Sequence, residues 1–272
     1  MIHGPLALRT VLLAIAFGLA SPAFAADRCA APDEITANTA PLSHVGQVLS
    51  RQGALNVLTV GSATVFSPDE SIGPGTITGL ALGLSNIPKS GDLMPSDAAF
   101  PMQMANALRQ SNPGLKVVVT VKGGRGMLAS EMLAIIRSEL AAHSYQLVIW
   151  QTGTVEAVRN VPSGEFFQTL SDGAATASDA GADLVLVDPQ FSRFLHANAD
   201  VDPYTQALQQ VAGQVGVVLF HRFELMRYWS AEGQIDLERT PKSRRTQTVE
   251  VLHACLGASL ARFVAASANL PP

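Results

Sequence analysis

Residues 146–156 read QLVIWQTGTVE, an apolar run that ends in a polar, glycine-containing turn. Short runs that are apolar on both faces are typical of parallel strands covered by helices on each side of the sheet. The same construction recurs four times along the chain. The sequence therefore predicts five buried strands, at residues 55–60, 116–121, 146–150, 183–187 and 217–220.

Helix-like apolar periodicity separates these runs. The predicted helices cover residues 100–110, 128–141, 164–179, 203–215 and 248–266. Strands that alternate with helices indicate an α/β fold, here a flavodoxin-like three-layer α/β/α sandwich with a five-stranded parallel sheet. Ligands of such folds bind beyond the carboxyl ends of the strands. Residues 65–99, rich in Gly, Ser and Pro, form a long insertion beside that expected crevice.

Composition excludes several classes of protein. The 272 residues are 47% apolar and 15% charged, with a formal net charge of −4, and the one tight basic run is KSRR at residues 242–245. We therefore expect no nucleic-acid partner, because a phosphate backbone needs clustered cations. We also expect no metal and no cofactor, because no zinc, phosphate-loop or dinucleotide motif is present.

The first 25 residues are typical of a cleavable signal peptide. Arg9 precedes an apolar run at residues 11–19, and Ala23-Phe24-Ala25 supplies the small-x-small cleavage pattern. The alternative, an uncleaved anchor, is opposed by the length of the run, which is well below the ~20 residues that a span needs. We expect cleavage near Ala25, a single domain at residues 26–272 with no further membrane span, and a periplasmic or secreted location.

Export affects the interpretation of the two cysteines. Cys29 lies near the mature N-terminus and Cys255 near the C-terminus. In an oxidising compartment the two can form a disulfide that joins both ends of the domain. The alternative is a pair of buried thiols.

The order of the turns resembles that of the SGNH/GDSL hydrolases, in particular an exported bacterial group. The matching blocks are GSAT at 61–64, GGRGM at 123–127, QTGTVE at 151–156 and DPQ at 188–190, with FELMRYW at 223–229 and ACL at 254–256 further on. The resemblance spans nearly the whole mature chain. It implies ester hydrolysis or acyl transfer by a serine, a histidine and an aspartate three residues before that histidine. It also implies an oxyanion hole formed by the Ser N–H, a Gly N–H and an Asn side chain.

At most of these positions the chain departs from the family. The nucleophile position is Ala63, whose methyl group cannot attack a carbonyl. The oxyanion Asn falls on Val155 and the Asp after it on Glu156. Counting from Trp229 and Cys255, the Asp-x-x-His pair falls on two residues that cannot perform acid–base chemistry near neutral pH, Arg244 and Gln247.

The first hypothesis is therefore a catalytically degenerate, exported hydrolase-like protein. It would use the old crevice to bind a small ligand, a glycan or an envelope protein. Gly124 is retained from the oxyanion hole, and Arg125 beside it suits an anion or, equally, a structural salt bridge. The ligand-binding candidates are Ser62, Gly124, Arg125 and Thr154.

Two alternatives remain open. The first is an active esterase in which Ser62 is the nucleophile, with His253 as its base and Glu250 at the acid-x-x-His spacing. Against it, Ser62 also suits a turn residue whose hydroxyl bonds nearby backbone, and His253 suits a packed helix residue. The second alternative is a structural or assembly protein of the cell envelope that makes contacts through residues 65–99.

Other polar residues carry weaker signals. His221 follows the fifth strand but has no acid at a diagnostic spacing, and Asp188 suits a cap of the fourth strand. His196, near Asp200 and Asp202, fits a solvated acidic loop better than a cation site. The two tryptophans, Trp150 and Trp229, are expected in the core.

Overall fold

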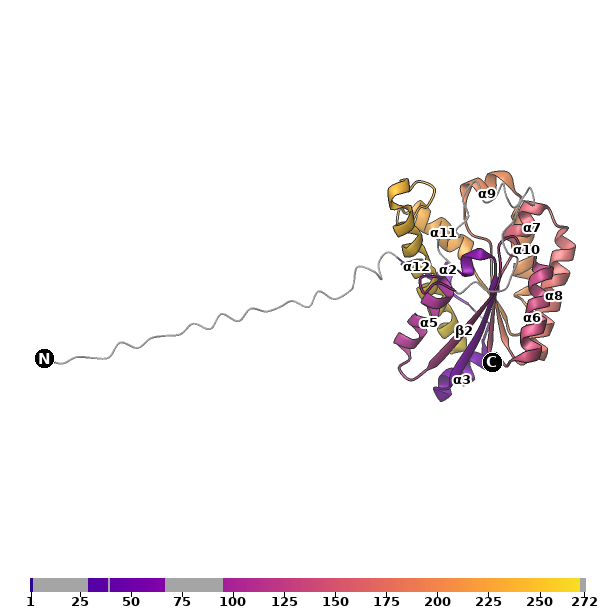
Figure 1. Ribbon diagram of the computed structural model, residues 1–272, viewed down its shortest axis with the longest axis horizontal. Helices are drawn as coiled ribbons and strands as arrows, with labels where there is room; N and C mark the ends of the chain where they lie inside the picture. Colours follow the sequence, from indigo (N-terminus) through magenta and orange to yellow (C-terminus); the bar gives the residue numbers. More distant parts are fainter. Residues whose placement is uncertain (2–28, 39, 67–94, 270–272) are drawn as a thin grey trace.

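The computed structural model describes Met1 and residues 29–38, 40–66 and 95–269 (Figure 1). Apart from Met1, the predicted signal peptide lies outside the described residues, and so does most of the predicted insertion at 65–99. The two ends of that insertion are described and lie together, because the Ser96 N–H donates to the carbonyl of Phe66 at 2.7 Å.

The predicted sheet is confirmed. Five parallel strands lie in the order β2-β1-β3-β4-β5, the flavodoxin-like order. Every strand lies within two residues of its predicted bounds. Their observed bounds are β1 Ala54–Gly61, β2 Lys116–Gly123, β3 Leu147–Gln151, β4 Asp183–Val187 and β5 Val217–Phe220. The largest difference is at β2, which continues to Gly123 because that residue pairs with Gly61 of β1.

Helices cover both faces of the sheet (Figure 1). One core layer joins the sheet to α3 (Ser43–Arg51), α5 (Phe100–Ser111), α11 (Arg222–Ala231) and α12 (Arg245–Ala268). The other joins it to α6 (Ala129–Ala142), α8 (Ser163–Asp179) and α10 (Asp202–Val211). The short elements are α2 (Asp33–Thr36), η1 (Ala63–Val65), α7 (Thr154–Arg159), α9 (Arg193–Asn198) and η3 (Lys242–Arg244). Together they form the three-layer sandwich that the alternation predicts.

One helix is shorter than predicted. The pattern at 203–215 extends four residues beyond the observed end of α10 at Val211. Turns follow, and Gly216 enters β5 with φ +76°. Glycine adopts that conformation without the strain that a Cβ brings, so the apolar Val215 that suggested helix is an exposed turn residue instead.

A disulfide joins Cys29 to Cys255, as predicted, across 226 residues of sequence. It fixes the start of the domain against α12, and the Trp229 indole N–H donates to the carbonyl of Ala30 at 3.0 Å beside it. Trp229 and Trp150 are both fully buried, in the two core layers. A disulfide at this position is compatible with export.

Within the described residues, one helical segment, Lys242–Ala268, is long and apolar enough to cross a membrane by length and composition. Most of its apolar stretch, 61%, is buried inside the protein, where α12 packs on α5 and α3. This burial is typical of the core helix of a globular domain.

Candidate functional site

The turn after β2 lies directly against the end of β1. Gly123 has φ +121°, and a Cβ there would lie 2.0 Å from the carbonyl oxygen of Gly61. The next N–H, that of Gly124, donates to the same carbonyl at 3.1 Å. The glycine retained from the family's oxyanion hole therefore has its N–H bonded to β1. Arg125, beside it, is half-buried in the turn.

Ser62 belongs to a closed set of side-chain hydrogen bonds. Its hydroxyl oxygen accepts from Nε2 of Gln151 at 2.7 Å. The Thr64 hydroxyl donates to Oε1 of the same glutamine at 2.9 Å, and the two hydroxyl oxygens lie 3.4 Å apart. Neither an amide nor a hydroxyl can act as a general base near neutral pH. These partners are side chains, one at the end of the adjacent β3 and one in the same turn, in place of the backbone partners expected for a turn serine.

His253 lies in the core, where it caps another helix. Its side chain is 2% exposed, and Nδ1 accepts from the Phe100 N–H at 3.2 Å. That N–H is the first of α5, a helix whose N-cap residue Ala99 supplies no side-chain bond. Burial, with a contribution from the charge of Arg222, lowers the pKa of His253 to about 3. The imidazole is therefore neutral near pH 7 and has a structural partner.

The structure does not join the three residues of the esterase alternative into a hydrogen-bonded chain. The described partners of Ser62 are Gln151 and Thr64, and the described partner of His253 is Phe100. Glu250 is exposed on the first turns of α12. Catalysis by these residues would require a different arrangement of the side chains.

Glu156, at the position of the aspartate that follows the oxyanion Asn in the family, stabilises the starts of two helices. Its buried carboxylate accepts from the N–H groups of Ala129, which begins α6, and Gly153, which precedes α7, at 2.5 and 3.0 Å. Burial raises its pKa, although these N–H groups oppose the shift. Val155 is buried beside it. Thr154 is also buried, and its hydroxyl has no hydrogen-bond partner among the described residues.

His221 lies near an acid that the sequence did not reveal, although burial lowers the pKa of the imidazole. Oδ2 of Asp188, at the end of β4, lies 3.9 Å from Nδ1 of His221, at the end of the adjacent β5. Oδ1 of Asp188 accepts from the Phe223 N–H at 2.8 Å, and its carbonyl accepts from Nε of the buried Arg222 at 3.1 Å. Burial raises the pKa of Asp188 and lowers the pKa of Arg222. Asp188 therefore fixes the start of α11 against β4, and its carboxylate caps that helix instead of the fourth strand.

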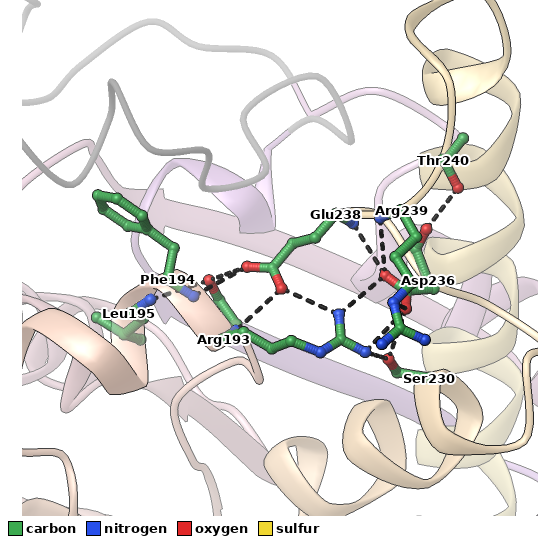
Figure 2. Close-up of polar contacts among 9 residues, drawn as sticks. Arg193, Phe194, Leu195, Ser230, Asp236, Glu238, Arg239 and Thr240 are labelled. Carbon is green, nitrogen blue, oxygen red and sulfur yellow. Dashed lines mark hydrogen bonds and ion pairs between the residues drawn. The ribbon is translucent and has the colours of Figure 1, made fainter.

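The loops at this end of the sheet are joined by one arginine (Figure 2). Arg193, at the start of α9, donates from both terminal nitrogens to Asp236, at 2.9 and 3.2 Å. It also donates to Glu238 at 3.1 Å and to Ser230 at 2.7 Å. Glu238 in turn accepts from the hydroxyl of Ser192 at 2.7 Å. The loop after β4 is thereby held to the segment between α11 and α12.

That segment bounds a cavity of about 590 Å³. Arg244 and Gln247, the positions that the resemblance assigns to the acid and the base, both line it. Both side chains are exposed, at the N-terminal end of α12. The two positions therefore lie on one wall of the same cavity, and their assignment to the acid and the base stays a prediction.

The described residues contain no group of three or more His, Cys, Asp or Glu side chains that could hold a metal ion. His196 instead lies near Phe223, with their rings 6.1 Å apart.

Sequence reasoning missed Gln151 and Arg222 as site residues. The order of the strands is the signal that finds them, because neighbouring parallel strands bring their carboxyl ends side by side.

The order of the strands and the position of the turns are those of an SGNH/GDSL hydrolase-like fold, and solved structures agree. An esterase with two domains, active on acetylated mannans, has a TM-score of 0.55 at 14% identity, covering 86% of this chain and 55% of that one. An acetylxylan esterase from Geobacillus stearothermophilus has a TM-score of 0.50 at 14% identity, and the match covers 77% of this chain and 94% of that one. An α/β hydrolase enzyme from the metagenome of Lake Arreo, Spain, has a TM-score of 0.51 at 16% identity, and the match covers 76% of this chain and 98% of that one. At these identities the likeness shows the fold alone.

The family follows from the sequence itself. Residues 28–270 match the non-GDSL lipase-like family, and the chain belongs to that family. No curated protein matches the sequence.

Proposed function

We propose that this protein is an exported, catalytically degenerate member of its family that binds a small ligand or glycan at the old ester-hydrolase site. The observation that carries the proposal is the set of hydrogen bonds made by Ser62 and His253, the nucleophile and the base of the esterase alternative. The Ser62 hydroxyl is bonded to Gln151 and Thr64, while Nδ1 of His253 accepts from the Phe100 N–H. A nucleophilic serine instead needs a base within about 3 Å of its oxygen.

The other family positions support the same proposal. Ala63 offers no nucleophile and Val155 no hydrogen-bond donor. The N–H of Gly124 bonds the carbonyl of Gly61, and Glu156 stabilises helix starts. Loss of one oxyanion donor alone typically lowers the rate about 10²–10³-fold. The changes together favour a protein that retains the fold without the chemistry.

Export rests on two features. Residues 1–25 have the pattern of a signal peptide, and the disulfide between Cys29 and Cys255 suits an oxidising compartment. A carbohydrate ligand is supported by analogy of fold, because solved neighbours include esterases of acetylated mannan and acetylated xylan. The envelope-assembly alternative depends on residues 65–99, which lie mostly outside the described residues, and it stays a prediction.

The test is hydrolysis of a short acyl ester and of an acetylated xylo-oligosaccharide by the chain from Ala26 onward. The matched variant is Ser62→Ala. We expect no turnover above buffer from either protein. Turnover that disappears in the variant would establish the esterase alternative with Ser62 as its nucleophile. Equal turnover in both would also contradict the proposal, because it would place the chemistry on another residue.

A further inference from the structure

The cavity between α11 and the start of α12 has the size of a small-molecule site. Its volume of about 590 Å³ lies within the ~300–1,000 Å³ range of ligand pockets. Its walls come from residues 230–241 and from the first turns of α12. The Arg193 hydrogen bonds to Asp236 and Ser230 hold one wall in place, so the site is formed before a ligand arrives.

The charge around this cavity favours an anion. Arg239 and Arg244 line it, and among the described lining residues Asp236 is the one acidic side chain. Burial opposes the charge of Asp236, but the Arg193 guanidinium and the Arg239 N–H outweigh burial and lower its pKa. Asp236 is therefore ionised and paired with Arg193, which it shares with Glu238. Arg239 lies further from it, with 3.8 Å between Nε and Oδ2, and its side chain is 77% exposed.

The start of α12 adds to this preference. The helix has 24 residues, its N-cap Arg244 makes no side-chain capping bond, and its first turn has no acidic residue. Such a helix start carries a partial positive charge that a bound anion compensates. The basic run at 242–245 lies at this helix start, in a chain whose net charge is negative.

A separate observation indicates hydroxyl groups on the ligand. Oε1 of Gln234 is buried at the cavity wall and has no hydrogen-bond partner among the described residues. A buried acceptor is stabilised by a donor, and a ligand hydroxyl supplies one. Ile235 and Val251 provide apolar wall on which the carbon face of a sugar ring can pack.

We propose that this cavity binds a small hydroxylated carboxylate of the sugar-acid class. Arg239 and Arg244 pair with the carboxylate, and Oε1 of Gln234 accepts a hydrogen bond from a hydroxyl. Arg244, at the position of the family's acid, would thus serve recognition of an anion. This assignment names a ligand class for the binding function proposed above and rests on it.

The test is calorimetric titration of the chain from Ala26 onward with glucuronate, and with glucose as the neutral analogue of the same size. The variant Arg239→Gln with Arg244→Gln removes both cations from the cavity wall. Its matched control, Lys242→Gln with Arg245→Gln, removes the same charge from exposed residues of the same basic run that do not line the cavity. All of these side chains are exposed, so each variant is expected to fold.

We expect glucuronate to bind with a dissociation constant on the order of a millimolar. The lining variant should weaken binding at least about tenfold and the control variant less than about twofold, because charge-assisted bonds act at short range. Glucose should bind at least about tenfold more weakly. Absence of glucuronate binding, equal binding of glucose, or equal losses in both variants would each overturn the assignment. Failure of the proposed function is distinguishable, since it appears as ester turnover, whether or not Ser62→Ala removes it.

Discussion

Nε2 of Gln151, at the end of β3, donates a hydrogen bond to the hydroxyl oxygen of Ser62, just after β1, at 2.7 Å. The same amide accepts from Thr64 through Oε1. Both polar ends of one glutamine are therefore satisfied by the turn that carries the nucleophile position. This relationship indicates that Ser62 joins two strand ends.

Ser62→Ala should accordingly lower the free energy of unfolding by about 1–3 kcal/mol, because it leaves the Gln151 N–H without that partner. Ser171→Ala is the matched control, since the Ser171 hydroxyl has no hydrogen-bond partner among the described residues. That variant should be neutral or slightly more stable, as alanine favours a helix. Urea unfolding measures both. Equal effects would contradict a specific role for the Ser62–Gln151 bond.

The Gly123 turn predicts a second contrast. Gly123→Ala should prevent folding or cost more than about 3 kcal/mol, because the new Cβ would lie 2.0 Å from backbone oxygen at φ +121°. Gly216→Ala is the control, with φ +76° and open space around the added atom. It should cost only the ~1–2 kcal/mol of left-handed backbone. Thermal unfolding of the two variants separates steric overlap from strain, and similar losses would show that the approach to Gly61 is not critical.

His253 makes stability depend on pH. Its pKa is lowered from an ordinary 6.5 to about 3, so the unfolded chain binds the proton more readily than the folded one. The stability linked to this group is complete above pH 6.5 and is lost as the pH falls toward 3. Within that window its share of the slope is up to about 1.4 kcal/mol per pH unit.

His253→Asn removes the titrating group while keeping an acceptor for the Phe100 N–H. Urea unfolding from pH 4 to 7 should then show a slope that is shallower by up to about 1.4 kcal/mol per pH unit, whatever the variant's absolute stability. A slope identical to that of the parent chain would mean that His253 titrates alike in the folded and unfolded chains.

Four of the strands were predictable because they are buried on both faces, whereas the edge strand β2 has exposed residues and was predictable from its run of β-branched residues. Their residues are almost all apolar, and the turn residues mark each end. The short helices α7 and α9 were missed, since six residues are too few for a periodic pattern, and the longer α3 and α11 were missed as well. The assignment of Ala63, Arg244 and Gln247 to the family's catalytic positions comes from the sequence and stays a prediction. The capping role of His253 was not predictable, because it depends on how α12 packs against α5. The two residues that make the contact, His253 and Phe100, are 153 positions apart in the sequence.

The disulfide predicts a large effect of reduction. In the chain-entropy account, a loop of 226 residues stabilises the folded state by about 5 kcal/mol, and often less in practice. Cys29→Ala removes the bond at its half-buried end and disturbs packing least. Urea unfolding of this variant and of the reduced parent chain should give the same lowered midpoint. An unchanged midpoint in both would show that the ends are held by packing alone.

The family positions predict what restores chemistry. Ala63→Ser alone should give no ester hydrolysis, because Gln247 cannot accept the serine proton. Adding Arg244→Asp and Gln247→His supplies an acid three residues before a histidine, in the spacing that the family uses. Both residues are exposed at one cavity, so the changes should not disturb the core. A general base contributes about 10²–10⁴-fold, so the triple variant should exceed Ala63→Ser by at least about tenfold even without the oxyanion Asn.

The control is the variant with Arg244→Asp and Gln247→His on the parent Ala63. It carries the new histidine without a serine at the nucleophile position. Hydrolysis of a short acyl ester that appears only when all three changes are present would support the assignment of Ala63, Arg244 and Gln247 to the family's catalytic positions. Equal hydrolysis in the control would mean that the histidine acts alone or with Ser62, and the nucleophile assignment to residue 63 would then be wrong.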